Sequence, residues 1–230
     1  SESQSQNFYM TYQATAVFHK NLASAHDVKM LLGVSRETMD QKYYFASRQS
    51  LPYPDYPVLR VGAEDETMSN DGTRSQWALQ SYFGRVNYNF KERYLFEANV
   101  RFDGSSRFAT GHQWGVFPSF SGAWRMSEEP WMNEVKHILT EMKIRASYGT
   151  LGNQNISSSN YPFAELLNMD IYSVNDVLVP AAYRSSLANE GITWETSEMT
   201  DIGVDLSLWN KFTVTADWYL KNTHGILMTL

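Results

Sequence analysis

The chain has 230 residues, of which 43% are hydrophobic and 19% charged, and its formal net charge is −6 at pH 7. This apolar content excludes a disordered tail, and the negative charge leaves no basic footprint for nucleic acid. Cysteine is absent, which excludes disulfides and thiolate metal sites.

Eight segments alternate apolar and polar residues with a period of two, which is typical of strands whose faces meet different environments. In chain order they lie near residues 12–18, 28–34, 82–90, 94–102, 120–126, 142–148, 202–208 and 212–220. In the fourth segment, Phe96 and Val100 fall on one side, and Glu97 and Arg101 fall on the other. One short helix is predicted near 130–139, where Pro130 occupies a first-turn position.

Short and long connections alternate between these segments. The long ones span about 36–76, 104–113 and 150–197, whereas "KER" at 91–93 and "WNK" at 209–211 are brief. In an antiparallel order, all brief turns then fall at one end, as in outer-membrane barrels. Aromatic residues beside the brief turns fit a membrane interface, although aromatics in strands also commonly pack a core.

The polar sides of the segments are rich in Arg, Asn, Asp, Glu and Ser. This composition favours a polar barrel interior, and the exposed face of a soluble sandwich stays open as the alternative. The side chains predicted to face such an interior are Arg85, Glu97, Arg101, Arg145 and Asp205.

Three collinear stretches identify a family. They are SYFGRVNYNFKERYLFEANVRFDGSSRF (81–108), WGVFPSFSGAWRMSEEPWM (114–132) and MKIRASYGTLGNQNI (142–156). In this order and spacing they closely resemble the barrel of SusC/RagA-type TonB-dependent transporters. The resemblance implies an all-β fold, in which about eight antiparallel transmembrane strands form part of a barrel of ~22 strands. Residues 1–230 would be a partial barrel domain, with the plug domain and TonB box outside this chain.

The same resemblance implies a function in the outer membrane of a Gram-negative cell. The expected activity is TonB-dependent import of a glycan or an oligopeptide together with a SusD-like surface lipoprotein. TonB would act through a segment outside this chain. A soluble secreted β-sandwich that binds carbohydrate is the alternative, and a glycoside hydrolase would need two carboxyl groups facing one cleft.

Substrate contacts are expected from the longest loop. Its side-chain amides can donate and accept hydrogen bonds to a sugar or a peptide, and its aromatic rings can stack on a sugar. The same amides can instead form hydrogen bonds within the loop, and the rings can pack against it. The candidates are Asn153, Gln154, Asn155, Tyr161, Tyr172 and Trp194. Asp103-Gly104-Ser105-Ser106 is predicted to form a turn, with Arg101 and Arg107 pairing carboxylates rather than touching substrate.

No catalytic or cofactor motif is found. The sequence lacks a nucleophile elbow, a P-loop, a dinucleotide glycine pattern and a zinc-protease motif, so neither an enzyme nor a cofactor is expected. The acidic stretch 63–71 lacks calcium-loop spacing and is predicted to be solvated, and no metal site is expected. Eight strands alone would enclose too small an interior for so many charges, so the strands near 8–18 and 212–222 are predicted not to pair.

Overall fold

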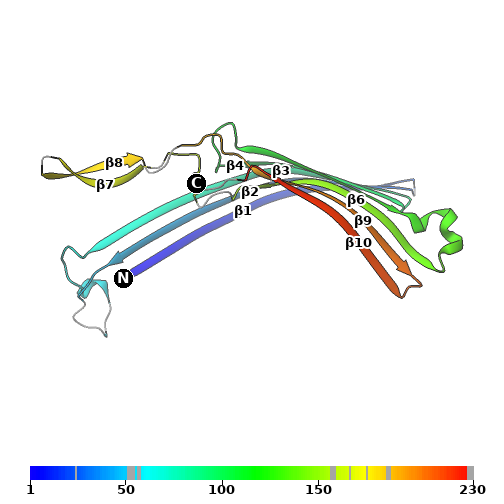
Figure 1. Cartoon of the computed structure of the whole chain (residues 1–230), viewed down its shortest axis with the longest axis horizontal. Helices are drawn as coiled ribbons and strands as arrows, with labels where there is room; N and C mark the ends of the chain where they lie inside the picture. The colour runs from blue at the N-terminus through cyan, green and yellow to red at the C-terminus, as the bar shows by residue number, and fades with distance from the viewer. Residues whose placement is uncertain are drawn as a thin grey trace.

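A computed structural model describes residues 1–23, 25–50, 55, 58–155, 159–165, 167–174, 176–184 and 188–226. These residues form one curved antiparallel sheet of eight strands in the order β1-β2-β3-β4-β5-β6-β9-β10 (Figure 1). A separate two-stranded sheet, β7–β8, lies off one end of it (Figure 1). The all-β antiparallel architecture predicted from the period-two pattern is confirmed.

The strands of the large sheet are β1 (Glu2–Leu22), β2 (His26–Ser47), β3 (Ser69–Phe90), β4 (Tyr94–Ser105), β5 (Trp114–Arg125), β6 (Leu139–Asn153), β9 (Glu195–Leu208) and β10 (Phe212–His224). The small sheet contains β7 (Leu167–Val174) and β8 (Val177–Arg184). Three 3-10 helices complete the described elements: η1 (Leu59–Val61), η2 (Met126–Glu128) and η3 (Pro130–Val135).

The tight turns lie at one end of the large sheet. In the β3–β4 turn, Lys91 and Glu92 have φ values of 52° and 57°, and in the β9–β10 turn Trp209 and Asn210 have values of 53° and 54°. Paired left-handed residues give a hairpin turn the twist that its flanking strands require. The connections after β2, β4 and β6 lie at the opposite end, as predicted, but the link 126–138 with η2 and η3 is also long and lies at the tight-turn end.

The two outermost strands, β1 and β10, are edges of the sheet. Each pairs with a single neighbour, β2 and β9 respectively, and the described residues show no pairing between them. The eight strands therefore form an open arc rather than a closed barrel, as predicted.

The structure corrects several predicted boundaries. Strands β2 and β3 continue to Ser47 and from Ser69, so the predicted loop at 36–76 is much shorter. The apolar alternation ends near Val34. Polar residues beyond it can still form backbone hydrogen bonds between strands in water, so the strand pairing extends farther than the sequence pattern predicts. The region at 150–197 contains the unpredicted β7–β8 hairpin, and the helical segment at 130–139 is a 3-10 turn following a second one.

Few hydrophobic side chains are buried, because the large sheet is a single layer. The buried ones among the described residues are Phe108, Ala109, Phe117, Met132 and Trp194. Three of them pack together at the long-loop end, and Met132 lies in η3 at the short-turn end. In the described residues the buried aromatic core thus lies at the long-loop end, while the faces of the sheet remain open.

Candidate functional site

The two faces of the large sheet differ in chemistry. On β4, Phe96 and Phe102 lie on one face and remain 47% and 45% exposed, whereas Glu97 and Arg101 lie on the other. The register continues this division, since Ala98 pairs with Val86 and Phe120, and Asn99 pairs with Arg85 and Ser119. The apolar face includes Tyr82, Val86, Phe96, Val100, Phe120, Ile144, Val204 and Val214. The polar face includes Arg85, Glu97, Arg101, Arg145 and Asp205.

Aromatic side chains lie at both ends of the apolar face. Near the short turns, the Tyr94 ring stacks on Phe90 and on Trp124, with centroids 6.1 and 6.4 Å away. Toward the long loops, Tyr82 stacks on Trp114 at 6.0 Å. From Trp114 to Trp124, β5 covers ~33 Å of strand, or ~25 Å of height at a barrel tilt of ~40°. That height matches the apolar band of an outer-membrane barrel, about 25 Å tall.

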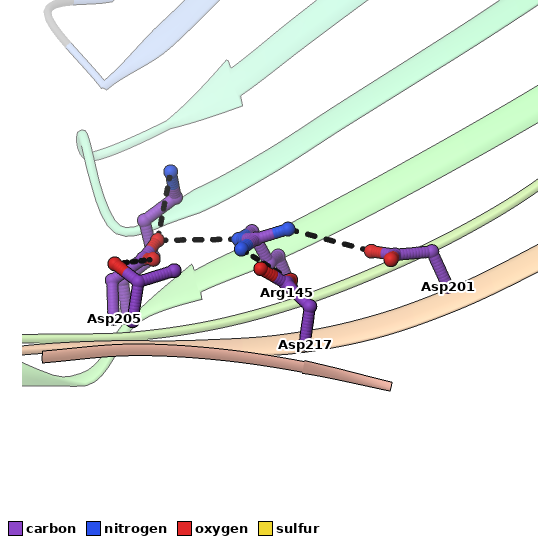
Figure 2. A network of polar contacts seen from close by, with 6 residues as sticks. Arg145, Asp201, Asp205 and Asp217 are labelled. Atoms are coloured by element: carbon purple, nitrogen blue, oxygen red, sulfur yellow. Dashed lines mark hydrogen bonds and ion pairs between the residues drawn. The ribbon is translucent and has the colours of Figure 1, made fainter. Parts of the chain in front are cut away.

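A cluster of charges spans β6, β9 and β10 on the polar face (Figure 2). Arg145 is its centre and contacts three carboxylates, at 3.3 Å to Asp201, 3.3 Å to Asp205 and 2.5 Å to Asp217. Lys143 adds a second cation, 3.7 Å from Asp205. Two cations thus face three carboxylates, which gives the cluster a formal charge of −1.

Gly203 allows this arrangement. It lies on β9 directly between Arg145 on β6 and Asp217 on β10 in the register. A Cβ atom at Gly203 would collide with the Asp217 carboxylate and would lie 2.7 Å from Arg145 Nη2. The guanidinium therefore crosses the strand through the space that a side chain would fill.

A second network occupies the middle of the polar face. Arg85 donates to Asn99 Oδ1 at 2.6 Å, and Asn99 donates to Glu97 Oε1 at 2.8 Å. Asn87 donates to the other oxygen of Glu97, while Arg85 lies 3.9 Å from this carboxylate. The hydrogen bonds fix the Glu97 carboxylate between two amides, on a half-buried part of the face.

Arg101 forms a third group toward the long loops. It donates to both oxygens of Asp103, at 3.2 and 3.0 Å, and to Ser81 Oγ at 3.1 Å. Its guanidinium also lies over the Phe83 ring, 5.5 Å from the centroid. Asp103 lies within β4, which continues to Ser105, so the predicted Asp-Gly-Ser-Ser turn begins later than expected.

The long-loop end is held by an aromatic core. Phe108 is fully buried, with Trp194 5.2 Å from its ring, and Trp194 lies a further 5.2 Å from Phe117. The Trp194 indole Nε1 donates to the carbonyl of Gln113 at 3.0 Å. Gly152 leaves room for the Phe117 ring, which a Cβ atom there would strike. The loop after β4 and the segment before β9 are thereby fixed to each other.

Side-chain hydrogen bonds reinforce that contact. Ser105 Oγ donates to Gln154 Oε1 at 2.7 Å, and Arg107 donates to Asn155 Oδ1 at 2.7 Å. Arg107 also lies over the Trp77 ring, 5.3 Å from its centroid. The motif GNQN and the motif DGSSRF, recognised separately in the sequence, therefore contact each other.

The six predicted substrate residues fall into two groups. Five of them form hydrogen bonds within the chain: Asn153 with Glu195, Gln154 with Ser105, Asn155 with Arg107, Tyr161 with the amide of Gln76, and Trp194 with Gln113. Tyr172 instead lies apart on the β7–β8 hairpin and is 47% exposed. Trp194 is only 7% exposed, so most of its ring is unavailable at the surface.

Sequence reasoning did not identify two features. One is the β7–β8 hairpin, whose side chains Leu167, Met169 and Ile171 lie on one face and are more than 60% exposed. The period-two pattern of this segment is the signal that could have found it. The other is Glu129, which accepts hydrogen bonds from Tyr94 at 2.5 Å and Trp124 at 3.1 Å. The Tyr94 hydroxyl holds the pKa of the Glu129 carboxyl below its usual range.

Among the described residues, no group of three or more His, Cys, Asp or Glu side chains is placed to hold a metal ion. No helix in the described part of the chain is long and apolar enough to cross a membrane.

Comparison with known proteins connects these features to a family. The family model described as TonB dependent receptor-like, beta-barrel, matches residues 1–230. The chain belongs to this family. TonB-dependent receptor barrels are outer-membrane proteins, which agrees with an apolar face bounded by two aromatic rows.

Two relatives and one solved structure illustrate the similarity. A TonB-dependent receptor of Formosa agariphila is 31% identical over 222 residues, covering 95% of this chain and 21% of the relative. The TonB-dependent receptor SusC of Bacteroides thetaiotaomicron is 35% identical over 158 residues, covering 65% and 15%. The structure of the RagAB peptide transporter superposes with a TM-score of 0.90 at 22% identity, covering 99% of this chain and 25% of that one.

These matches confirm the SusC/RagA-type resemblance found in the sequence. The chain spans only 15% to 21% of the length of the curated relatives. It therefore represents a limited arc of the barrel that a TonB-dependent receptor forms.

Proposed function

We propose that this chain is part of the wall of an outer-membrane importer. The complete protein would take up a glycan or an oligopeptide, driven by TonB through a segment outside residues 1–230, and would work with a SusD-like surface lipoprotein. Residues 1–230 would constitute a partial barrel domain whose polar face lines the interior.

One observation carries this proposal. The large sheet is a single layer with unlike faces and an unpaired edge on each side. A bare edge cannot remain in lipid, because its amides and carbonyls would lack partners, so further strands must continue the sheet. A curved sheet with an apolar band ~25 Å tall on one face is the wall of a membrane barrel.

The polar face supports the passage of a hydrophilic cargo. A groove of about 520 Å³ on this face is lined by Gln13, Glu37, Arg85, Arg101 and Asp103 among others. Both cations there already pair with carboxylates, so the groove offers hydrogen-bonding groups without a strong net charge. Such a lining suits sugars or peptide backbones, and the RagAB structure is described as a peptide transporter.

The β7–β8 hairpin supports a partner at the long-loop end. An isolated two-stranded hairpin is marginally stable in water unless its hydrophobic face is covered. Met169 is 71% exposed and Ile171 63% exposed on one such face. We assign this face to contact with the surface lipoprotein, with Tyr172 on the opposite face available to cargo.

Uptake by the full-length protein tests the proposal. The gene would be deleted in its host and restored as wild type or with Arg101→Gln. Fluorescent oligosaccharides and oligopeptides would be supplied as separate pools. The wild-type protein should import one pool, and uptake should stop in a strain lacking TonB. Heat-modifiable migration in an SDS gel would show that each barrel is folded. Import of neither pool by a correctly folded barrel would exclude the proposed transport.

The partner contact needs its own measurement. Met169→Ser with Ile171→Ser should reduce co-purification of the lipoprotein encoded beside the gene, whereas Asn168→Ser on the opposite hairpin face should not. Equal recovery with both variants would remove the hairpin from the interface.

The alternative, a secreted carbohydrate-binding sandwich, requires a second sheet against the apolar face. The other sheet in the described residues contains only β7 and β8, and it lies beyond the end of the large sheet (Figure 1). Without such a second sheet, a soluble protein would leave Phe96 and Val214 half-exposed to water, at 47% and 51%. The membrane assignment accounts for both observations.

A further inference from the structure

Arg107 is a cation at the long-loop end of the polar face. Its guanidinium lies over the Trp77 ring, 5.3 Å from the centroid. Trp77 precedes Arg85 by eight residues on β3, so the two side chains lie on the same, polar face of the strand. Trp77 also lies five residues beyond Tyr82, or about 17 Å farther toward the long loops. Arg107 is therefore held over the polar face, on the long-loop side of the apolar band.

Arg107 has no carboxylate partner in this chain. All 25 Asp and Glu residues lie in the part of the chain that the structure describes, and none of them forms an ion pair with Arg107. At this end of the polar face, Asp103 pairs with Arg101, and Glu37 accepts a hydrogen bond from the Tyr9 hydroxyl at 2.6 Å. The expectation from the sequence that Arg107 pairs with a carboxylate is thus wrong for the carboxylates of this chain.

Most N–H donors of the Arg107 guanidinium are unused. Nη1 donates to Asn155 Oδ1 at 2.7 Å, and Nε is buried without a partner among the described residues. Nη2 also lacks a hydrogen bond to those residues, but it is not buried, so it remains open to a ligand. Burial lowers the pKa of the guanidinium, which reflects lost hydration, although arginine stays charged at neutral pH. An anion that accepts from Nη2 would offset part of this lost hydration.

The chain fixes Arg107 in this position before any ligand binds. The Arg107 backbone amide donates to Ser105 Oγ at 3.1 Å, and the next residue, Phe108, is fully buried in the aromatic core. Contacts with Asn155 and Trp77 hold the guanidinium itself. Little side-chain entropy is then lost when a ligand binds, which favours a specific contact over a loose electrostatic attraction.

Neutral donors and an exposed aromatic ring lie beside this cation. Gln154 and Asn155 accept hydrogen bonds through their side-chain oxygens, and their amide nitrogens make no hydrogen bond with the described residues. Tyr9 is 54% exposed, and its ring centroid lies 6.2 Å from that of Trp77. Amide nitrogens donate to carboxylate or hydroxyl oxygens, and an exposed ring packs against a sugar or a peptide. An organic acid with further polar groups fits this surface better than an inorganic anion does.

We propose that Arg107 binds a carboxylate of the cargo, so that the importer selects acidic oligomers over their neutral counterparts. A uronic acid in a glycan and an acidic group in a peptide present the same planar carboxylate to a guanidinium. The inference rests on the proposed function, because it assigns a chemical class to the cargo of that importer.

Binding to the full-length protein in a neutral detergent tests this subsite. Fluorescently labelled uronic-acid oligosaccharides would be compared with their methyl esters, and Glu-containing peptides with Gln-containing, C-terminally amidated analogues. The wild-type protein should bind the acidic form of one pair about ten-fold more tightly than the neutral form, as expected for a partly solvated charge-assisted hydrogen bond. The pair that shows this preference identifies the source of the carboxylate.

Substitutions connect the preference to Arg107. Arg107→Gln should remove it, and Arg107→Lys, which keeps the charge but loses the planar fork, should retain part of it. Arg74→Gln is the matched control. It removes the same charge three residues from Trp77, but Arg74 pairs with Asp40 on the opposite face of β3, so the preference should equal that of the wild-type protein. Heat-modifiable migration would show that each variant is folded.

The possible failures differ from one another. Equal binding of acidic and neutral forms by the wild-type protein, or an unchanged preference in Arg107→Gln, would overturn the subsite and leave transport intact. A loss in Arg107→Gln that is the same for both forms would also overturn it, since Arg107 would then only hold the loops or pair with a carboxylate elsewhere in the full-length protein. A folded wild-type protein that binds and imports neither form of either pair would contradict the transport proposal, and the subsite with it.

Discussion

Arg145 on β6 and Asp217 on β10 form an ion pair of 2.5 Å, although β9 lies between their strands. Strands two apart in a sheet are separated by about 9–10 Å, so only a long side chain crossing an empty position can close this distance. Gly203 is that position. The edge strand β10 is thereby linked to β6 by a side chain as well as through its backbone pairing with β9.

Gly203→Ala should break this link. The added Cβ would occupy the space of the Arg145 guanidinium, and the full-length barrel should unfold at a slightly lower temperature, since the pair is partly solvated. Thermal unfolding followed by heat-modifiable migration would measure the change. Gly122→Ala is the matched control, because a Cβ there meets only Leu95 O at 3.9 Å. Equal melting temperatures for the two variants would show that Arg145 can relocate freely.

Arg145→Gln should leave three carboxylates facing Lys143 alone. Their mutual repulsion should lower the unfolding temperature in low salt, and added salt should restore part of the loss by screening. A double-mutant cycle with Asp217→Asn would isolate the coupling of this pair from that of the other carboxylates. A salt-independent loss would point to packing rather than charge.

Val100→Arg should be far more damaging than Asn99→Arg. Val100 lies on the apolar face and Asn99 is its neighbour on the polar face. An arginine facing lipid near the bilayer midplane costs about 2–4 kcal/mol, and one facing a polar interior costs little. Urea unfolding of the full-length protein in lipid vesicles would compare the two. The reverse order would invert the assignment of the faces.

Glu129 should contribute a pH-dependent component of stability. Hydrogen bonds from Tyr94 and Trp124 hold the pKa of this carboxyl below its usual range, so the unfolded chain binds its proton at a higher pH than the folded chain does. The contribution is therefore present above the usual glutamate pKa of ~4.3 and is lost as the pH falls through the lower, folded value. Glu129→Gln should flatten this acid-side decline in unfolding temperature.

Glu134→Gln provides the comparison for Glu129, since both residues lie in the link between β5 and β6 and the Glu134 carboxylate has no salt-bridge partner among the described residues. An unchanged acid profile in Glu129→Gln would exclude the hydrogen bonds as its cause.

Phe108→Ala should loosen the loop end without unfolding the sheet. Removing a fully buried aromatic side chain typically costs about 3–5 kcal/mol, here in a small core at the long-loop end of the sheet. Limited proteolysis should then cleave the 154–194 region faster, while heat-modifiable migration remains. Tyr172→Ala, at an exposed position, should leave the cleavage rate unchanged.

The sequence predicted the strands best where one face meets an apolar environment. Phe96 and Val100 alternate with Glu97 and Arg101 because lipid-facing and interior-facing positions select different residues, so β4 was recognised directly. Beyond Val34 that selection ends, and the continuation of β2 to Ser47 gave no comparable signal. The five polar residues predicted to line an interior do share one face, and their orientation in a complete barrel remains a proposal.

The contacts between distant segments could not be read in the same way. Trp194 was predicted either to stack on a sugar or to pack within the protein, and the structure places it against Phe108 and Phe117. That contact depends on the β6–β9 pairing, which joins strands that are not consecutive in the chain. Arg145 likewise meets Asp217 only through a register that no local pattern specifies.

The insertion of β7 and β8 between two paired strands has a consequence for the order of folding. Every other pairing in the large sheet joins consecutive strands, so it can form as a local hairpin. Strand β9 must instead pair with β6 across the segment 154–194, which includes β7 and β8. Closing this loop has an entropic cost that the hairpin pairings largely avoid, and the cost rises with the logarithm of the flexible length. A preformed β7–β8 hairpin shortens that flexible length. Docking of β9 on β6 is therefore expected to be the slow step, and hairpin variants that do not touch the large sheet should delay it.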